Sequence, residues 1–354
     1  MSLEDHKEDI QKVWQLFYEG HLRESDVLAA KLIEAERETI PFLPVTEILT
    51  AKAQYLALTG RRREAAPFLA KALNRAPDNP YPQELSLALL RAEVVARNGA
   101  ETLKKRGEAG RLVMGLGTGR CGSTSLTQLL MAQKTGCFSH EHPPDLSWSL
   151  PPAGLRFHLQ RFSFLAQIYE LVADVGHWWL PHMDTVAKFF PDFRAVVMKR
   201  DKAETVESFV KVKNGDSKGG VNHWIDHDGS HWGKVPFDRC YPSYPVSDIR
   251  EAIGLYWEEY YQRCEKLAER HPGQLKVFDI SALKSAEGQR EILEFCGFTD
   301  PVVGQRFHAN VGHYKDGEDL WGNPFLPQQQ QEQAQEQAAA QPARRDRVRR
   351  AERA

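Results

Sequence analysis

A glycine-rich segment that joins a short apolar run to a helical pattern constrains this chain more than any other feature. Residues 112–126 read LVMGLGTGRCGSTSL, in which four glycines and an arginine precede a run of hydroxyl residues. A glycine-rich turn between a strand and a helix presents backbone N–H groups and the positive end of the helix dipole. The segment therefore predicts a phosphate-binding loop in an α/β fold.

The pattern from residue 111 onward alternates between apolar runs and helical periodicity. The run FRAVVM at 193–198 is apolar throughout, which is typical of a strand in a parallel sheet covered on both faces. This alternation predicts a three-layer α/β domain of the P-loop type over residues 106–320, with a parallel sheet flanked by helices. Strands are expected at 111–115, close to Ser139, near 172–175, at 193–198 and at 275–280, and helices at 123–133, 159–173, 181–190, after Asp201, at 247–270 and at 286–296.

The N-terminal region, residues 1–105, is expected to be all-helical. Residues 46–80 form two helical patterns that Gly60 separates and Pro77 ends. With small residues at Ala65 and Ala72, this unit resembles a tetratricopeptide repeat, and about two and a half such units are present. So few units predict a region that leans on the following domain and that offers a surface for a protein partner. Residues 321–354 are rich in Gln, Ala and Arg, which predicts a disordered tail.

Composition narrows the class of protein. A net charge of −2 over 354 residues gives no sign of a nucleic-acid-binding protein. The five cysteines, at irregular spacings, argue against a disulfide framework and against a zinc site. The first residues, MSLEDHKEDI, lack the apolar core of a signal peptide, and no apolar run approaches the ~18 residues of a membrane span. A cytoplasmic protein without an integral membrane segment is therefore expected.

Two familiar interpretations fit the loop incompletely. GTGRCG at 117–122 matches the dinucleotide pattern G-x-G-x-x-G, and Glu141 follows at about the distance of a ribose-binding acid. An arginine and a cysteine inside the pattern, and three hydroxyl residues after it, have no evident use in such a site. Read instead as a nucleoside-triphosphate loop, the segment has Ser123 where the lysine should be, so its main electrostatic clamp is missing.

A third interpretation gives each of these residues a use. The loop would cradle a 5′-phosphate whose charge Arg120 meets, while the following hydroxyls donate to the phosphate oxygens. In this form the segment resembles the 5′-phosphosulfate loop of the sulfotransferases that use 3′-phosphoadenosine 5′-phosphosulfate (PAPS), a strand followed by G-x-[RK]-[SC]-G-[ST]-T. The resemblance implies that the donor is bound by Gly119, Arg120, Cys121, Gly122, Ser123, Thr124 and Ser125.

A second phosphate site is expected, because PAPS also carries a 3′-phosphate. Arg200 follows the apolar strand, and Ser208 lies eight residues later on the next helix. The pair is similar to the family's 3′-phosphate site, and the planar fork of arginine suits a dianionic phosphate. The resemblance extends over residues 111 to about 315 and implies a late contact from Lys315. One departure is Ser125, at the position where an aromatic residue often stacks on adenine.

The resemblance implies an in-line transfer of the sulfuryl group from PAPS to a hydroxyl or amine, without a requirement for metal. Arg120 would stabilise the leaving phosphate. His177, in GHWWLP, is placed like the catalytic histidine of cytosolic sulfotransferases, and Glu141, between His140 and His142, is the second candidate for the base. The segment 214–245, with several aromatic residues, is expected to cover the acceptor.

Other functions remain open at this point. A P-loop nucleotide kinase or NTPase is one alternative, and a non-catalytic nucleotide-binding adaptor with repeat-type helices is another. The acceptor itself is not determined by the sequence, so a small molecule, a glycan and a protein all remain candidates. No nucleic-acid partner is expected.

Overall fold

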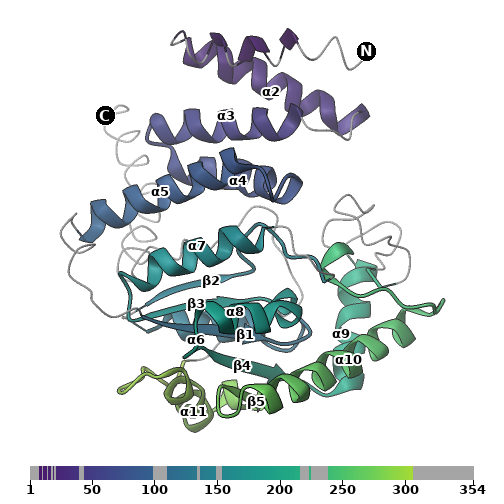
Figure 1. Ribbon diagram of the computed structural model, residues 1–354. Coiled ribbons are helices and arrows are strands. Elements are labelled where there is room, and N and C mark those ends of the chain that lie inside the picture. The colour runs from purple at the N-terminus through teal and green to yellow at the C-terminus, as the bar shows by residue number, and fades with distance from the viewer. Residues whose placement is uncertain are drawn as a thin grey trace, which may run out of the picture.

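The computed structural model describes residues 8–9, 11–13, 15–16, 19, 21–39, 44–98, 110–133, 136–148, 154–215, 223–224 and 238–305. Within them the expected α/β architecture is confirmed, as a five-stranded, all-parallel sheet with helices on both faces (Figure 1). The strand order is β2-β3-β1-β4-β5. The strands are β1 (Arg111–Leu116), β2 (Cys137–His140), β3 (Leu171–Val175), β4 (Arg194–Lys199) and β5 (Leu275–Asp279).

The central strands are apolar because both of their faces are covered. Successive side chains of β1 enter two different cores: Leu112 and Met114 face one, and Val113 faces the other. One face is covered by α6 (Ser123–Met131) and α11 (Ala286–Cys296). The other is covered by α7 (Leu155–Ala166), α8 (Met183–Phe189) and α10 (Ile249–Arg270), and α9 (Lys202–Gly215) adds Phe209 to the same core.

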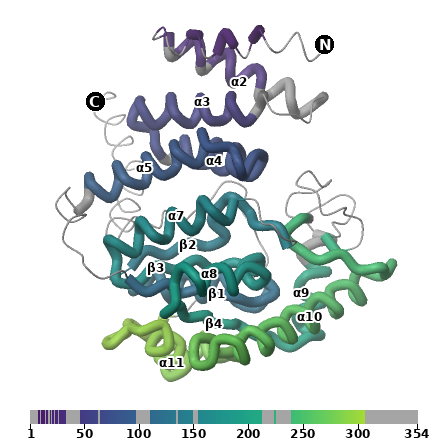
Figure 2. Tube along the Cα trace, viewed as in Figure 1, coloured from purple at the N-terminus to yellow at the C-terminus, as the bar shows by residue number. Residues whose placement is uncertain are grey.

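Helices α2 to α5, which precede the sheet, lie over α7, as the tube view shows (Figure 2). They are α2 (Leu22–Thr39), α3 (Pro44–Leu58), α4 (Arg62–Arg75) and α5 (Pro80–Asn98). The small residues Ala65 and Ala72 are fully buried, which lets α3 and α4 approach closely. Phe157 of α7 belongs to the same core as Leu56 and Ala65, so the helices are packed onto the α/β part of the chain.

Two predicted helices were wrong in extent. The helix expected at 159–173 ends at Ala166, and residues 171–175 are strand β3. The strand is buried on both faces and is apolar except for Asp174, so its residues continue the helical periodicity and hide the boundary. The helix expected at 181–190 is divided into a 3₁₀ helix, η2 (His177–His182), and α8. Pro181 lacks the N–H that a continuous helix would need at that position.

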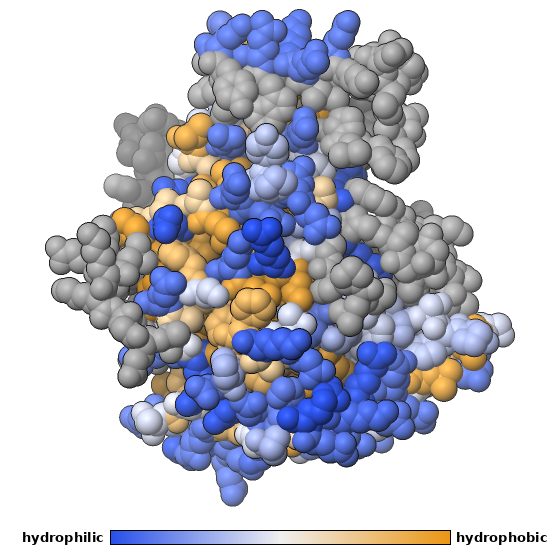
Figure 3. Space-filling view, viewed as in Figure 1, coloured by the Kyte–Doolittle hydropathy of each residue, from blue (hydrophilic) through white to orange (hydrophobic). Residues whose placement is uncertain are grey.

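Residues 306–354, which include Lys315 and the Gln/Ala/Arg-rich segment, lie outside the described residues. The five cysteines are all free and buried. In the described part of the chain, no helix combines the length and the apolar character that crossing a bilayer requires. On the face drawn in Figure 3, hydrophobic colouring gathers at the level of α5, α7 and α8, and the region of α10 and α11 is mostly hydrophilic.

Candidate functional site

The residues expected to carry the chemistry follow the carboxyl ends of four neighbouring strands. Glu141 comes directly after β2, His177 two residues after β3, the glycine-rich loop after β1, and Arg200 directly after β4. Parallel strands share one carboxyl edge, so all four lie along it. After β1 the chain crosses to β2 at one side of the sheet, whereas β4 leads to β5 on the other. This divergence makes the β1–β4 junction the place where α/β sheets bind ligands.

The loop after β1 depends on its glycines. Gly117, Gly119 and Gly122 have φ angles of 150°, 81° and 96°. A Cβ atom on Gly122 would lie 2.9 Å from Leu283 Cδ1, and one on Gly117 would lie 2.8 Å from the carbonyl oxygen of Met198. Glycine is needed there both for its left-handed backbone and for the lack of a side chain. Arg120, between them, also has a positive φ, of 54°.

The first turn of α6 presents the expected donors. Gly122 is its N-cap. Because glycine has no side chain, the N-cap residue accepts no side-chain hydrogen bond from the N–H groups of the first turn. Ser123, Thr124 and Ser125 are half-buried. Cys121 differs from them, because its side chain is fully buried, and burial raises the pKa of its thiol to about 11. Cys121 therefore offers the loop its backbone N–H and not a reactive sulfur.

The two predicted phosphate motifs meet. Arg120 donates from Nε to Ser208 Oγ at 3.2 Å, and Arg200 donates from Nη1 to the carbonyl oxygen of Arg120 at 3.3 Å. Arg200 also pairs with Glu204, from Nε to Oε2 at 2.9 Å. At the start of α9 a capping box is half formed: Asp201 accepts from the N–H of Glu204, but the carboxylate of Glu204 is bonded to Arg200.

The two candidate bases also lie together. His177 Nδ1 is 3.5 Å from Glu141 Oε1, and the side chains are 4% and 32% exposed. Within the part of the chain that the structure describes, neither ring nitrogen of His177 has a hydrogen-bond partner, although both are buried. The imidazole stacks on Tyr241, with ring centroids 4.4 Å apart. Glu141 is the second non-glycine residue with a positive φ, of 49°.

Beside this pair lies a buried carboxyl that the sequence did not single out. Asp145 is 5% exposed, and its backbone N–H donates to Asn74 Oδ1 of α4 at 2.8 Å. Burial raises the pKa of Asp145 to about 7, and the charge of Glu141 adds to the rise, while Arg239 and Asn74 oppose it. No pattern of spacing marks this residue, because Arg239 and Asn74 reach it from distant segments.

His142, which follows Glu141, is half-buried and packed against other side chains. His142 stacks on Phe157, at 6.4 Å, and burial together with the charge of Arg161 holds its pKa well below its usual range. Asp174 of β3, fully buried, accepts from Ser139 Oγ at 2.5 Å and from the backbone N–H of His142 at 3.4 Å. These bonds fix the turn that carries Glu141 to the sheet edge. The fixed turn keeps Glu141 close to His177.

The segment expected to cover the acceptor is described only in part. Trp224 and Tyr241 are buried, with ring centroids 4.9 Å apart, and Trp224 also contacts Tyr256 of α10. Trp232 and Lys315 lie outside the described residues. Of these described aromatic residues, Tyr241 stacks on His177, and Trp224 packs against the ring of Tyr241.

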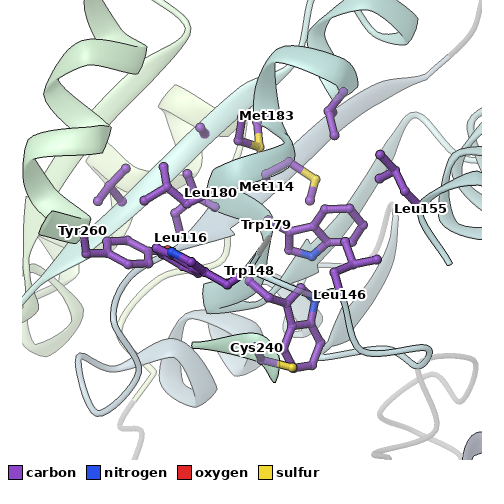
Figure 4. Close-up of a cluster of buried hydrophobic side chains, with 14 of the residues drawn as sticks. Met114, Leu116, Leu146, Trp148, Leu155, Trp179, Leu180, Met183, Cys240 and Tyr260 are labelled. Atoms are coloured by element: carbon purple, nitrogen blue, oxygen red, sulfur yellow. The ribbon is translucent and has the colours of Figure 1, made fainter. Parts of the chain in front are cut away.

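The helix expected at 247–270 is α10, but sequence reasoning did not identify its aromatic stripe as part of the site. Its segment YWEEYY contains two adjacent pairs of aromatic residues, and the pairs are about one helical turn apart. The four side chains therefore form one stripe along the helix. They form hydrogen bonds with backbone groups at the strand ends: Tyr256, Trp257, Tyr260 and Tyr261. Figure 4 shows Tyr260, Trp148 and Cys240, from three distant segments, around the end of β1. The unusual density of aromatic residues was the available signal.

Among the described residues, no group of three or more His, Cys, Asp and Glu side chains is arranged to hold a metal ion. Comparison with known proteins adds no relative: no family model matches the chain, and no curated protein matches it.

Proposed function

We propose that the protein is a sulfotransferase, which transfers the sulfuryl group of PAPS to a hydroxyl or amine of an acceptor by in-line displacement. One observation carries the proposal. Arg120 of the glycine-rich loop and Ser208 of α9 are hydrogen-bonded, and Arg200 bonds to the same loop residue. A donor with phosphates at its 5′ and 3′ positions needs two anion sites within the reach of one molecule. The contacts between the loop and the Arg200–Ser208 pair bring two such sites together.

In this proposal the loop residues 119–125 hold the 5′-phosphosulfate, and Arg200 and Ser208 hold the 3′-phosphate. The bonds that now join Arg120 to Ser208 would be exchanged for bonds to phosphate oxygens. The arginines suit this task, because a guanidinium stays charged at every physiological pH and donates in a fork that matches a phosphate. Glu204 would compete for Arg200, although its carboxylate is 61% exposed and is free to move into water.

The chemistry requires a base on one side of the sulfur and a cation on the other. The acceptor oxygen or nitrogen forms a bond to sulfur while the bond from sulfur to the bridging phosphate oxygen breaks. Arg120 stabilises the charge that develops on that oxygen. His177 takes the acceptor proton at Nε2, and Glu141, 3.5 Å from Nδ1, stabilises the imidazolium that forms. The two candidate bases thus act as a pair with different roles.

A P-loop kinase or NTPase would use a similar sheet and loop. It is disfavoured by Ser123, which stands in place of the lysine that reaches the β- and γ-phosphates. The two functions differ in the nucleotide that they prefer. Adenosine 3′,5′-bisphosphate should bind more tightly than ATP with Mg²⁺ if the proposal is right, and ATP should bind more tightly if it is wrong.

Titration calorimetry with adenosine 3′,5′-bisphosphate tests donor binding without knowledge of the acceptor. Arg120→Ala and Arg200→Ala are each expected to weaken binding at least 10-fold, because a lost charge-assisted hydrogen bond is worth about 1.5–3 kcal/mol. Arg270→Ala is the matched control, since it removes an exposed arginine that pairs with Asp184. Equal affinity in all four proteins would contradict the assignment of both phosphate sites.

Transfer of labelled sulfate from PAPS into a cell extract tests the reaction itself. The wild-type protein should label an acceptor, and His177→Ala should lower the rate by about 10²- to 10⁴-fold, the usual contribution of a general base. Glu141→Gln should cause a smaller loss. Tight binding of adenosine 3′,5′-bisphosphate without transfer to any acceptor would favour a non-catalytic adaptor.

We also propose that helices α2–α5 are a tetratricopeptide-like region that binds a partner protein. The buried small residues Ala65 and Ala72 support this, because they occur where paired helices of such repeats approach. A pull-down with residues 1–105 deleted and with the full chain would compare the partners retained by each.

A further inference from the structure

The aromatic stripe of α10 bonds to backbone groups at the carboxyl ends of three strands. Tyr261 donates to the carbonyl oxygen of Met198 at 2.8 Å, and Trp257 donates to that of Arg200 at 3.0 Å, both at the end of β4. Tyr256 donates to the carbonyl oxygen of Thr118, in the loop after β1, at 3.2 Å. Tyr261 also contacts Thr118, but none of these three side chains bonds to His177 at the end of β3.

Tyr260 differs from the other three, because its hydroxyl joins the glycine-rich loop to His177. It accepts from the N–H of Gly117 at 2.9 Å and donates to the carbonyl oxygen of His177 at 3.0 Å. A phenolic oxygen can accept and donate at the same time, so both bonds are formed at full strength. Gly117 is the first residue of the glycine-rich loop, and His177 is the candidate base. A single atom thus connects the two halves of the site.

The surroundings of Tyr260 leave little room for either bond to adjust independently. Tyr260 is 0% exposed, and its ring packs between Trp148, Tyr256 and Tyr261. Gly117 is hemmed in, since a Cβ atom there would lie 2.4 Å from Cys121 Sγ. His177 is held between Tyr241 and Trp178. A displacement of the loop backbone is therefore passed to the carbonyl of His177 through the shared hydroxyl.

We propose that Tyr260 is a positioning residue that couples occupation of the phosphate loop to the placement of His177. This inference rests on the proposed function. The hydroxyl of Tyr260 is used in two backbone bonds, so the residue acts through His177 and does not touch the substrates. A donor that draws the loop amides toward its phosphate moves the N–H of Gly117 and, with it, the hydroxyl of Tyr260. The hydroxyl moves the backbone of His177, and the imidazole follows that backbone. The coupling is reciprocal, so the placement of His177 also affects donor affinity.

Nuclear magnetic resonance of protein labelled at histidine ¹³Cε1 measures the coupling directly. The resonance of His177 is assigned by its loss in His177→Gln, and it is followed as adenosine 3′,5′-bisphosphate is added to saturation. In the wild-type protein the resonance is expected to shift. In Tyr260→Phe, which keeps the ring and loses both bonds, most of that shift should disappear at saturation. Tyr261→Phe, the matched control, loses a hydroxyl that bonds to Met198 and contacts Thr118 but not Gly117 or His177, and it should keep the full shift.

Affinity gives a second readout. Removing the hydroxyl leaves a buried N–H and a buried carbonyl without a partner, so Tyr260→Phe should bind adenosine 3′,5′-bisphosphate about 10-fold more weakly, within the ~5- to 150-fold range of couplings between sites. Tyr261→Phe should change the affinity by less than about 3-fold, because its hydroxyl bonds neither to the N–H of Gly117 nor to His177.

The outcomes separate the two proposals. A wild-type protein that does not bind the nucleotide overturns the proposed function and the coupling with it. Binding without any shift of His177 in the wild-type protein overturns the coupling alone, even if Tyr260→Phe does not fold. An equal shift in Tyr260→Phe and Tyr261→Phe overturns it as well, since the shift would then come from the charge of the nucleotide itself.

Discussion

Arg120 and Glu141 share a backbone conformation that few residues with side chains adopt. Their φ angles are 54° and 49°, in the left-handed region. This conformation costs roughly 1–2 kcal/mol for a residue other than glycine. Such strain persists only where the surrounding structure enforces it, and it concentrates at functional sites. Both residues were selected from the sequence for their chemistry, and the strain is an independent reason to place them in a working site.

Arg120→Gly separates the role of this side chain from its effect on stability. Glycine adopts a positive φ without strain, so the free energy of unfolding should stay within about 1 kcal/mol of the wild-type value. Binding of adenosine 3′,5′-bisphosphate should be lost with the guanidinium. Urea unfolding and calorimetry measure the two properties. A large loss of stability together with retained binding would show that Arg120 is a structural residue.

Asp145 makes stability depend on pH. Its pKa is raised from 3.8 to about 7 by burial, so between these values the unfolded state releases a proton that the folded state keeps. Stability due to this group therefore falls as the pH rises through that window, by at most about 4 kcal/mol at 1.36 kcal/mol per unit. Asp145→Asn should be more stable than the wild-type protein at pH 8, and this advantage should shrink toward pH 4.

Asp279→Asn is the control with the opposite sign. The hydrogen bonds from Ser281 hold the pKa of Asp279 below its usual value, so this variant should lose stability at neutral pH and not in acid. Urea unfolding at pH 3, pH 5 and pH 8 compares the variants, because the Asp279 window lies below pH 3.8 and the Asp145 window above it. If Asp145→Asn showed no change with pH relative to the wild-type protein, the buried carboxyl would be ionised over the whole range.

At the scale of elements, the N-cap of α10 fixes where this helix begins. The side chain of Asp248, its N-cap, accepts from the N–H groups of Arg250 and Glu251 at 2.7 and 2.9 Å. The register of this helix sets which aromatic residues face the strand ends. The helix was expected to begin at residue 247, and the structure has its N-cap at Asp248.

Asp248→Ala is expected to lower the free energy of unfolding by about 1 kcal/mol, the usual cost of a lost N-cap. Ser247→Ala, one residue earlier and exposed, should change it by less than about 0.5 kcal/mol, as surface substitutions usually do. Chemical denaturation of both variants measures the difference. Equal losses would mean that the helix begins at Ser247 in solution.

At the scale of the whole molecule, the N-terminal helices are joined to the site. Phe157 of α7 is 0% exposed and shares a core with Leu56 and Leu69 of α3 and α4. Asn74 of α4 accepts from the backbone of Asp145, four residues after Glu141. The helices thus support the turn that carries Glu141, one of the two candidate general bases. The sequence predicted an N-terminal region with too few repeats to be stable by itself. The core that it shares with α7 is consistent with that interpretation.

Phe157→Ala tests this attachment. It should lower the free energy of unfolding by about 3–5 kcal/mol, because it removes a buried aromatic side chain and leaves a cavity. Phe189→Ala, whose side chain is 60% exposed, is the matched control and should cost less than about 1 kcal/mol. Limited proteolysis should release the N-terminal helices earlier in Phe157→Ala. Similar behaviour of the two variants would contradict a shared core.

The sequence by itself determined the elements and the types of residue at their ends. Apolar runs and turn residues predicted the strands, and the glycine-rich loop, Arg200 and Ser208 were recognised because their chemistry is local: charge, hydroxyl groups and left-handed turns are properties of a few neighbouring residues. The all-parallel sheet and its covering helices follow from the same local patterns.

Only the tertiary structure decided which residues meet. The strand order β2-β3-β1-β4-β5 places Glu141 beside His177, and it places Arg200 beside the loop. Nothing in the spacing identified Asp145, Asn74 or Tyr260, because each acts through a partner 71 or more residues away. The physical reason is that burial and hydrogen bonding depend on the packing of distant segments. Local sequence specifies which groups are present, and packing specifies the distances between them.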